Sequence, residues 1–311
     1  MTMILYLVMC AGTAVFLLAC VTRIVMYARA PLHLRWELYP VPHEAPARVK
    51  HGGSRFERID WWTQPVGRRL LGEWKFMIPE VLLLRGLYEF TRQLWYRSFP
   101  FHFGLYLLIG TAGLLMTGAL FSLLAPAAFP AALARALFRV GGVTGAAGLV
   151  LALLGAAGLL VRRLTDPSLR IYTTRGDMGN LIFFLAALGV LSAGSLLKPA
   201  AAPDALAILV GLITWNTALN IPGLLAAGMF LTSVLVAYIP LTHMSHFIAK
   251  YFTYHAVRWD DAPMWRGGKL ERRLAEYLTY RPTWAAAHVG ADGRRTWAQI
   301  ATDSAAPEGK K

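Results

Sequence analysis

Histidine is the residue type through which this sequence offers the most chemistry. The chain has 311 residues and eight histidines, and none of them lies between Phe103 and Thr242. His102 stands at the start of one long apolar run, and His243 and His246 stand near the end of another. A neutral imidazole binds transition metals, including haem iron. An ionisable side chain in an apolar run is a functional candidate by default, so these three histidines define the first candidate site.

The apolar runs beside these histidines are long enough to cross a membrane. Hydrophobic residues make up 56% of the chain and charged residues only 15%, against roughly 25% charged residues in soluble domains. A helical span needs about 20 apolar residues. The sequence therefore predicts an all-α integral membrane bundle of five transmembrane helices, over Met3–Tyr27, Phe101–Leu124, Ala136–Val161, Gly179–Leu197 and Ile221–Phe247.

Basic residues predict the orientation of this bundle. The chain has 31 Lys and Arg residues. Only three of them lie in or beside the loops after the second and fourth predicted spans, namely Arg135, Arg139 and Lys198. Cytoplasmic loops carry the excess of Lys and Arg, so the N-terminus is expected outside and the C-terminus in the cytoplasm, in a multi-pass protein of the inner (cytoplasmic) membrane.

The first run lacks the basic start and cleavage site of a signal peptide and is interpreted as a retained helix. Because these loops also explain the net charge of +14, no nucleic-acid partner is expected.

The expected organisation has four parts. Residues 1–28 form the first transmembrane helix, 29–98 a cytoplasmic insertion, 99–251 a four-helix haem-binding membrane region, and 252–311 a cytoplasmic partner-docking tail. Within the insertion, Val66–Arg97 alternates apolar and charged residues at near-helical spacing. This pattern predicts an amphipathic helix on the membrane lipid or against a partner. The tail carries four aromatic residues typical of a docking surface, namely Trp259, Trp265, Trp284 and Trp297.

The predicted topology places His102 and the later histidine pair at one membrane depth. Side chains from facing helices at one depth can bind a single haem iron from its two sides. Histidines near helix ends also lie among lipid headgroups, and this alternative remains open. Since His243 and His246 are three residues apart on a predicted helix, only one of them is expected to bind the iron. The spacing does not decide which one; the other is left to contact the haem, a quinone or lipid. Arg97 is the candidate partner for a haem propionate, although arginine is common at such boundaries.

The cysteines exclude other redox centres within this chain. The sequence has two, Cys10 and Cys20, both in the first apolar run. They form neither a Cys-x-x-Cys pair nor a haem-attachment motif. Iron–sulfur clusters are therefore expected only on partner subunits.

Two segments resemble a known family of membrane cytochromes. Phe101–Gly110, which begins Phe-His-Phe-Gly, resembles the second helix of the gamma subunit (cytochrome b) of respiratory nitrate reductase. Ile239–His246, which reads Ile-Pro-Leu-Thr-His-Met-Ser-His, is similar to the end of that family's fifth helix. The resemblance implies that His102 and His246 are the axial ligands of one b-type haem, and it makes His243 the weaker candidate.

The family carries a second haem that this sequence does not readily accommodate. Its ligands lie further along the second helix and earlier in the fifth. The corresponding stretches here, around Ala112 and Gly228, contain no histidine. One haem b is therefore expected, and the second is doubtful.

The insertion resembles a narrower group. Trp36–Glu44, with the sequence Trp-Glu-Leu-Tyr-Pro-Val-Pro-His-Glu, looks like the membrane subunits of menaquinol-oxidising complexes in sulfur- and sulfate-metabolising microbes. This resemblance implies menaquinone as substrate and a cytoplasmic iron–sulfur subunit of the heterodisulfide-reductase type as partner, alongside multihaem cytochromes c and further membrane subunits. A quinone site needs ionisable groups, and the candidates are His33, Glu37, His43 and Glu44. A purely structural loop is an equally weighted alternative.

Together these features predict a b-type cytochrome membrane subunit, the quinone-reactive electron-transfer part of a respiratory oxidoreductase complex. It would pass electrons between a membrane quinone and a cytoplasmic iron–sulfur partner. Two alternatives are a haem-free membrane anchor for a soluble redox enzyme and a transporter. The inverted repeats typical of transporters are not evident in the sequence.

Overall fold

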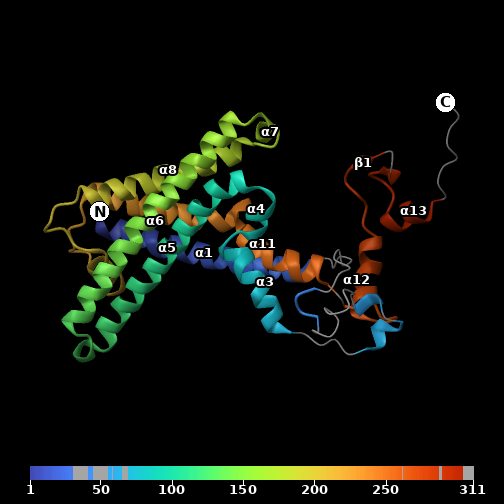
Figure 1. Ribbon diagram of the computed structural model, residues 1–311, viewed down its shortest axis with the longest axis horizontal. Coiled ribbons are helices and arrows are strands. Elements are labelled where there is room, and N and C mark those ends of the chain that lie inside the picture. Colours follow the sequence, from blue (N-terminus) through green and yellow to red (C-terminus); the bar gives the residue numbers. More distant parts are fainter. Residues whose placement is uncertain are drawn as a thin grey trace. The chain divides into compact units, whose positions relative to one another are not determined.

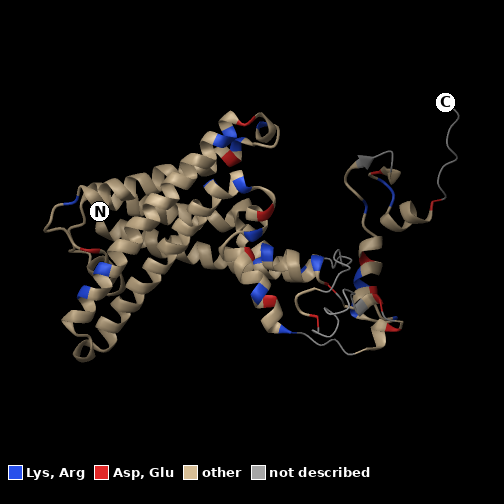
Figure 2. Cartoon of the chain, viewed as in Figure 1, with Lys and Arg blue, Asp and Glu red and all other residues tan. Residues whose placement is uncertain are grey.

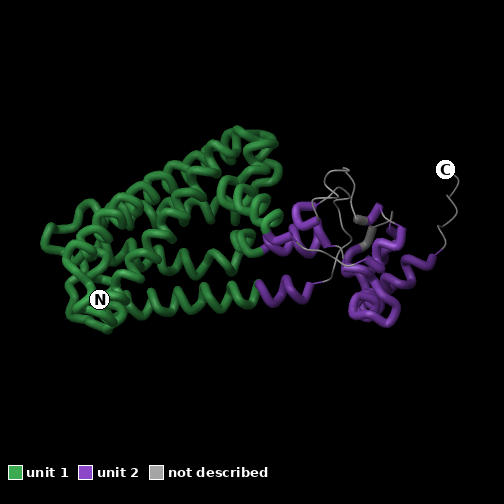
Figure 3. The backbone as a smooth tube through the Cα atoms, turned by 60° about the horizontal axis from the view of Figure 1, so that its bottom comes forward, with its two compact units in different colours: residues 1–23, 71–248 green, residues 24–70, 249–311 purple. Residues whose placement is uncertain are grey.

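The chain divides into two compact units, which we describe separately. The computed structural model describes residues 1–30, 41–44, 55–57, 59–64, 69–260, 262–286 and 289–303. Unit 1 comprises Met1–Arg23 and Leu71–Ile248, and unit 2 comprises Ile24–Leu70 and Ala249–Lys311 (Figure 3).

Five helices are long and apolar enough to cross a membrane, which confirms that part of the sequence prediction and suggests a multi-pass membrane protein. No Asp, Glu, Lys or Arg occurs in residues 2–22, 98–134, 140–161, 178–197 or 205–249. In Figure 2 the middle parts of the long helices are accordingly free of charge. The helices are α1 (Thr2–Arg29), α5 (Arg92–Leu124), α6 (Ala131–Thr165), α8 (Arg175–Leu196) and α10 (Gly223–Tyr238) (Figure 1).

Shorter elements connect and extend these five helices. The remaining helices are α3 (Leu70–Leu82), α4 (Arg85–Phe90), α7 (Pro167–Arg170), α9 (Ala205–Ile213), α11 (His246–Phe252), α12 (Lys269–Leu278) and α13 (Trp297–Thr302). The described residues of unit 2 also contain one antiparallel hairpin of β1 (Ala285–Ala286) and β2 (Ala291–Asp292). Short 3₁₀ turns occur at Arg55–Glu57, Trp61–Thr63, Pro126–Ala128, Ile239–Leu241 and His243–Ser245, and a π turn at Thr253–Arg258. The apolar run at 205–215, which is too short to span a membrane, forms the short helix α9.

The segment before the second long helix differs from its prediction. Instead of one amphipathic helix, the described part of Val66–Arg97 contains α3, α4 and the first residues of α5. The break between α3 and α4 lies at Leu84, whose backbone is left-handed with φ of 54°. A carboxylate oxygen of the buried Glu80 accepts a hydrogen bond of 2.9 Å from the amide of Gly86, which stabilises this corner. Helical periodicity alone could not reveal a turn stabilised by such a contact.

Helices α5 and α6 pack against one another at glycines (Figure 1). A Cβ atom added to Gly104 would lie 2.4 Å from the amide nitrogen of Ala152, and one added to Gly155 would lie 2.4 Å from that of Phe101. Small residues permit such close backbone approach, and membrane helix pairs use them for this purpose. Phe101, Ala152 and Phe184 of α8 belong to one buried core. This packing places the residue after Phe101, which is His102, beside the core of the bundle.

Helices α8 and α10 make a second close contact. A Cβ atom added to Gly228 of α10 would lie 2.4 Å from the Cα atom of Leu191, and one added to Gly194 of α8 would lie 2.6 Å from that of Leu225. The backbones of α8 and α10 therefore touch along this stretch, where lipid or a bulky side chain has no room to enter.

Candidate functional site

His102 lies inside α5, because this helix begins at Arg92 rather than near Phe101 as the sequence suggested. Its Nδ1 atom lies 2.8 Å from the carbonyl oxygen of Ser98, one turn earlier. A carbonyl only accepts, so Nδ1 carries the proton and donates this bond. In a neutral imidazole the other nitrogen, Nε2, is then the unprotonated one, which is the form that binds a metal.

The end of α10 is broken, and both His243 and His246 follow this break. The helix stops at Tyr238, and Pro240 follows in a 3₁₀ turn. Proline lacks the N–H that would continue the helical ladder. Thr242 then has extended backbone, with φ of −110° and ψ of −175°, and His246 begins the new helix α11. The predicted span Ile221–Phe247 is therefore not one continuous helix, because it is interrupted at Thr242, before both histidines.

An arginine from α1 braces this break. The Nε atom of Arg23 donates to the carbonyl oxygen of Pro240 at 3.2 Å, and its Nη2 atom donates to that of Leu241 at 3.1 Å. Carbonyls at a helix C-terminus lack helical donors and carry partial negative charge, so a guanidinium is well suited to them. Arg23 thus connects α1 to the segment that carries the later histidines.

The structure brings His102 and His246 together. Their ring centroids are 6.0 Å apart and their ring planes are inclined at 68°. An iron about 2 Å from one nitrogen of each of two opposed imidazoles puts the ring centroids roughly 6 Å apart. The separation of the rings and the proton on Nδ1 of His102 therefore fit a pair of imidazoles that would hold a haem. Among the described residues, no group of three or more His, Cys, Asp or Glu side chains is arranged to hold a metal ion.

His243 has a different environment. Its Nε2 atom lies 3.3 Å from Oδ1 of Asp177 and 3.4 Å from Nδ2 of Asn180, both on the first turns of α8. The Oδ1 atom of Asn180 accepts a 2.9 Å hydrogen bond from the hydroxyl of Tyr238. His243 is therefore part of a polar cluster with α8 and α10, whereas His246 faces His102.

Arg97 lies one turn before Phe101 and stacks its aliphatic stem on α6. A Cβ atom at Gly158 would lie 3.3 Å from Cγ of Arg97, and the Nη1 atom of Arg97 donates to the carbonyl of Gln93 at 2.7 Å. Five residues of helix separate Arg97 from His102, which is a rotation of about 140° around the axis. The role of Arg97 as a propionate partner stays a prediction.

Of the four quinone-site candidates, His33 and Glu37 lie outside the described residues. His43 and Glu44 belong to unit 2, where both are buried. The ring of His43 meets the buried Trp259 edge-on at 6.1 Å. Insertion and tail residues thus share a packed core in unit 2, and the structure does not place His43 or Glu44 in the same unit as the paired histidines.

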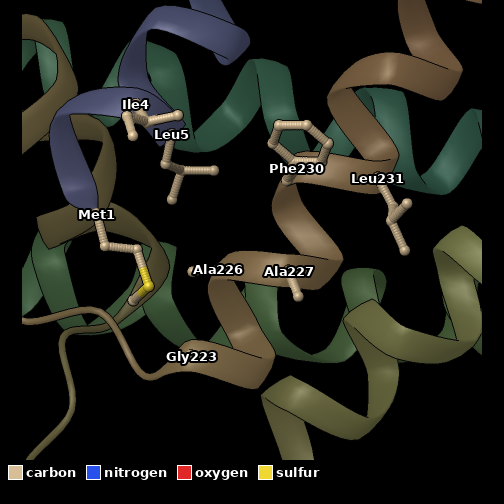
Figure 4. A pocket seen from close by; sticks show the side chains of 8 residues that line it. All are labelled: Met1, Ile4, Leu5, Gly223, Ala226, Ala227, Phe230 and Leu231. Atoms are coloured by element: carbon tan, nitrogen blue, oxygen red, sulfur yellow. The ribbon is translucent and has the colours of Figure 1, made fainter.

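An apolar cavity of about 420 Å³ opens elsewhere in unit 1, between the start of α1 and α10 (Figure 4). Its lining includes Met1, Ile4 and Leu5 of α1 and Gly223, Ala226 and Phe230 of α10. These side chains offer neither a histidine nor a hydrogen-bond donor.

Sequence reasoning missed most of the residues that surround the histidines. Asn180 is 5% exposed within an otherwise apolar span, and a buried polar residue in a span is a functional signal that the sequence did offer. Thr174 and Asp177 form a capping box at the start of α8, with the spacing Thr-x-x-Asp. This pattern is also readable from sequence. Ser98 and Arg23 left no such signal, because each acts through a backbone carbonyl.

Comparisons with protein-family models, with curated proteins and with solved structures find no match to this chain.

Proposed function

We propose that this chain is the b-type cytochrome membrane subunit of a respiratory oxidoreductase complex, in which His102 and His246 would hold one haem. The observation that carries this proposal is the 6.0 Å separation of the two imidazole rings, with Nδ1 of His102 bonded to the Ser98 carbonyl. The haem would supply one-electron transfer. The residues of the chain orient the imidazoles: Ser98 fixes one ring, and Arg23 braces the segment before the other.

The orientation in the membrane and the redox partners are part of the same proposal. The distribution of Lys and Arg favours an external N-terminus and a cytoplasmic C-terminus, so the histidine pair lies toward the cytoplasmic side. The resembled families favour menaquinone and a cytoplasmic iron–sulfur subunit as the two partners between which electrons pass. Trp265 and Trp284 in the tail are both about half exposed. Exposed tryptophans are enriched where proteins dock, which supports a partner on this side.

A redox difference spectrum of the purified chain tests the proposal. We expect a b-type band and one haem per chain. Substituting His102→Ala or His246→Ala should abolish the band, because each removes an axial nitrogen. His243→Ala is the matched control and should retain the band, since Nε2 of His243 faces Asp177 and Asn180.

Two results would overturn the proposal. If the purified chain lacks a haem band, the haem-free anchor becomes the better reading. If His243→Ala loses haem while His246→Ala keeps it, the ligand assignment is wrong. A stoichiometry of two haems per chain would require ligands other than those named here.

A further inference from the structure

The polar cluster beside the histidine pair contains more hydrogen-bonding groups than a helix cap requires. Asp177 of α8 uses only its Oδ2 atom for capping: this atom accepts from the amide and the hydroxyl of Thr174, both at 2.9 Å. Its Oδ1 atom faces His243 instead. Asn180, one turn further along α8, is buried and directs its amide nitrogen toward the same imidazole.

The orientation of the Asn180 amide is set by Tyr238. The hydroxyl of Tyr238 donates to Oδ1 of Asn180 at 2.9 Å, so Nδ2 is the atom that faces His243. Two groups of opposite kind thus lie near Nε2 of His243. The carboxylate oxygen of Asp177 accepts hydrogen bonds, and the amide nitrogen of Asn180 donates them.

His243 cannot satisfy both neighbours. If its Nε2 atom is protonated, it donates to Asp177 and cannot accept from Asn180; if unprotonated, it accepts from Asn180 and repels the carboxylate. The distances of 3.3 and 3.4 Å are also longer than a well-formed hydrogen bond of about 2.9 Å. A hydroxyl group both donates and accepts, so a ligand hydroxyl would satisfy the carboxylate and the amide together.

The charge of the cluster indicates a neutral ligand. The carboxylate of Asp177 lies 3.6 Å from Nη1 of Arg163, which balances its charge. A lipid phosphate would require a surplus of positive charge. The hydroxyl of a quinol is neutral and both donates and accepts, so it matches the carboxylate and the amide that the cluster presents.

The three side chains of the cluster differ in exposure. Asn180 is 5% exposed, Tyr238 is 36% exposed, and the side chain of His243 is 62% exposed. A ring that approaches the cluster would therefore contact His243 first. His243 is three residues from His246, a chain length of at most about 11 Å, so the site lies close to the proposed haem ligand.

We propose that Asp177, Asn180 and His243 bind one ring oxygen of the quinol, with Tyr238 orienting the amide of Asn180. This assignment rests on the proposed function and moves the quinone site from the insertion to the first turns of α8. It concerns binding of the quinone ring, whose apolar tail would lie in lipid.

Equilibrium binding of menadione in its reduced quinol form, a naphthoquinol without a tail, to the full chain in detergent tests the assignment. We expect Asn180→Leu and His243→Phe each to weaken binding about tenfold, the effect of losing one or two hydrogen bonds. Both variants should retain the b-type band. Asn220→Leu is the matched control, because Asn220 is exposed in the loop before α10, and it should bind reduced menadione as the unmodified chain does.

The outcomes separate the two proposals. Unchanged affinity for reduced menadione in both variants, with haem intact, overturns the quinone site and leaves the cytochrome function standing. Weakened binding of an anionic phospholipid with unchanged affinity for reduced menadione also overturns it, because the cluster would then be a lipid site. A chain that binds reduced menadione through these residues but contains no haem retains the site and refutes the cytochrome. Since His243 is exposed, His243→Phe remains informative if Asn180→Leu does not fold.

Discussion

Replacing Gly155 by alanine should force α5 away from α6 at the position where α5 carries His102. A Cβ atom at Gly155 would lie 2.4 Å from the amide nitrogen and 2.6 Å from the Cα atom of Phe101. Both are backbone atoms, so no side-chain rotation relieves the overlap. Ordinary carbon contacts begin at roughly 3.4 Å, and the two helices must therefore separate by about 1 Å. Inserting a methyl group into a close-packed interior costs about 1–3 kcal/mol.

Gly142 on the same helix provides the matched control. A Cβ atom there meets no atom within 4 Å. Alanine is a better helix former than glycine by about 1 kcal/mol, and this gain applies equally to both substitutions. The difference between the two variants therefore isolates the overlap, with Gly155→Ala less stable than Gly142→Ala by about 1–3 kcal/mol.

The assay compares the unfolding midpoints of both variants in one detergent, with unfolding monitored by tryptophan fluorescence. The haem content of each variant is measured as well. Because Phe101 precedes His102, Gly155→Ala should also bind less haem, whereas Gly142→Ala should match the unmodified chain. Equal midpoints for the two variants would refute the reasoning, since α5 and α6 would then not be in backbone contact at Gly155.

Two further predictions concern groups at helix ends. Arg23→Gln removes the charged donor to the two carbonyls after α10, so its haem content should fall. Arg23→Lys should retain an intermediate amount of haem. Equal haem content in the unmodified chain and both variants would contradict this role of Arg23. The hydroxyl of Ser168 holds the pKa of Asp166 below its usual value by donating to the carboxylate. A lowered folded pKa stabilises the fold above the usual value of about 4 and loses this contribution as the pH falls through the folded pKa. The midpoints of the unmodified chain and Asp166→Asn should therefore differ at neutral pH and converge in acid, and a constant difference would exclude this role.

Much of the helical framework could be predicted because it depends on local composition. Apolar runs of sufficient length specify spans wherever they occur, and the five long helices follow them. Their ends were less predictable. Helix α5 extends back to Arg92 through residues whose charges suggested a loop or surface helix, and the turn at Leu84 depends on the carboxylate of Glu80.

The sequence by itself identified the histidines and predicted one membrane depth for His102, at the start of a span, and His246, near the end of another. The tertiary structure decided which histidine faces which. Glycines such as Gly155 allow α5 and α6 to touch, and after the break at Pro240 the ring of His246 packs beside His102 while His243 lies beside Asp177. These pairings depend on how closely helices approach and how the chain rotates after a break. Both arise from contacts between residues far apart in the sequence, which hydropathy and spacing do not encode.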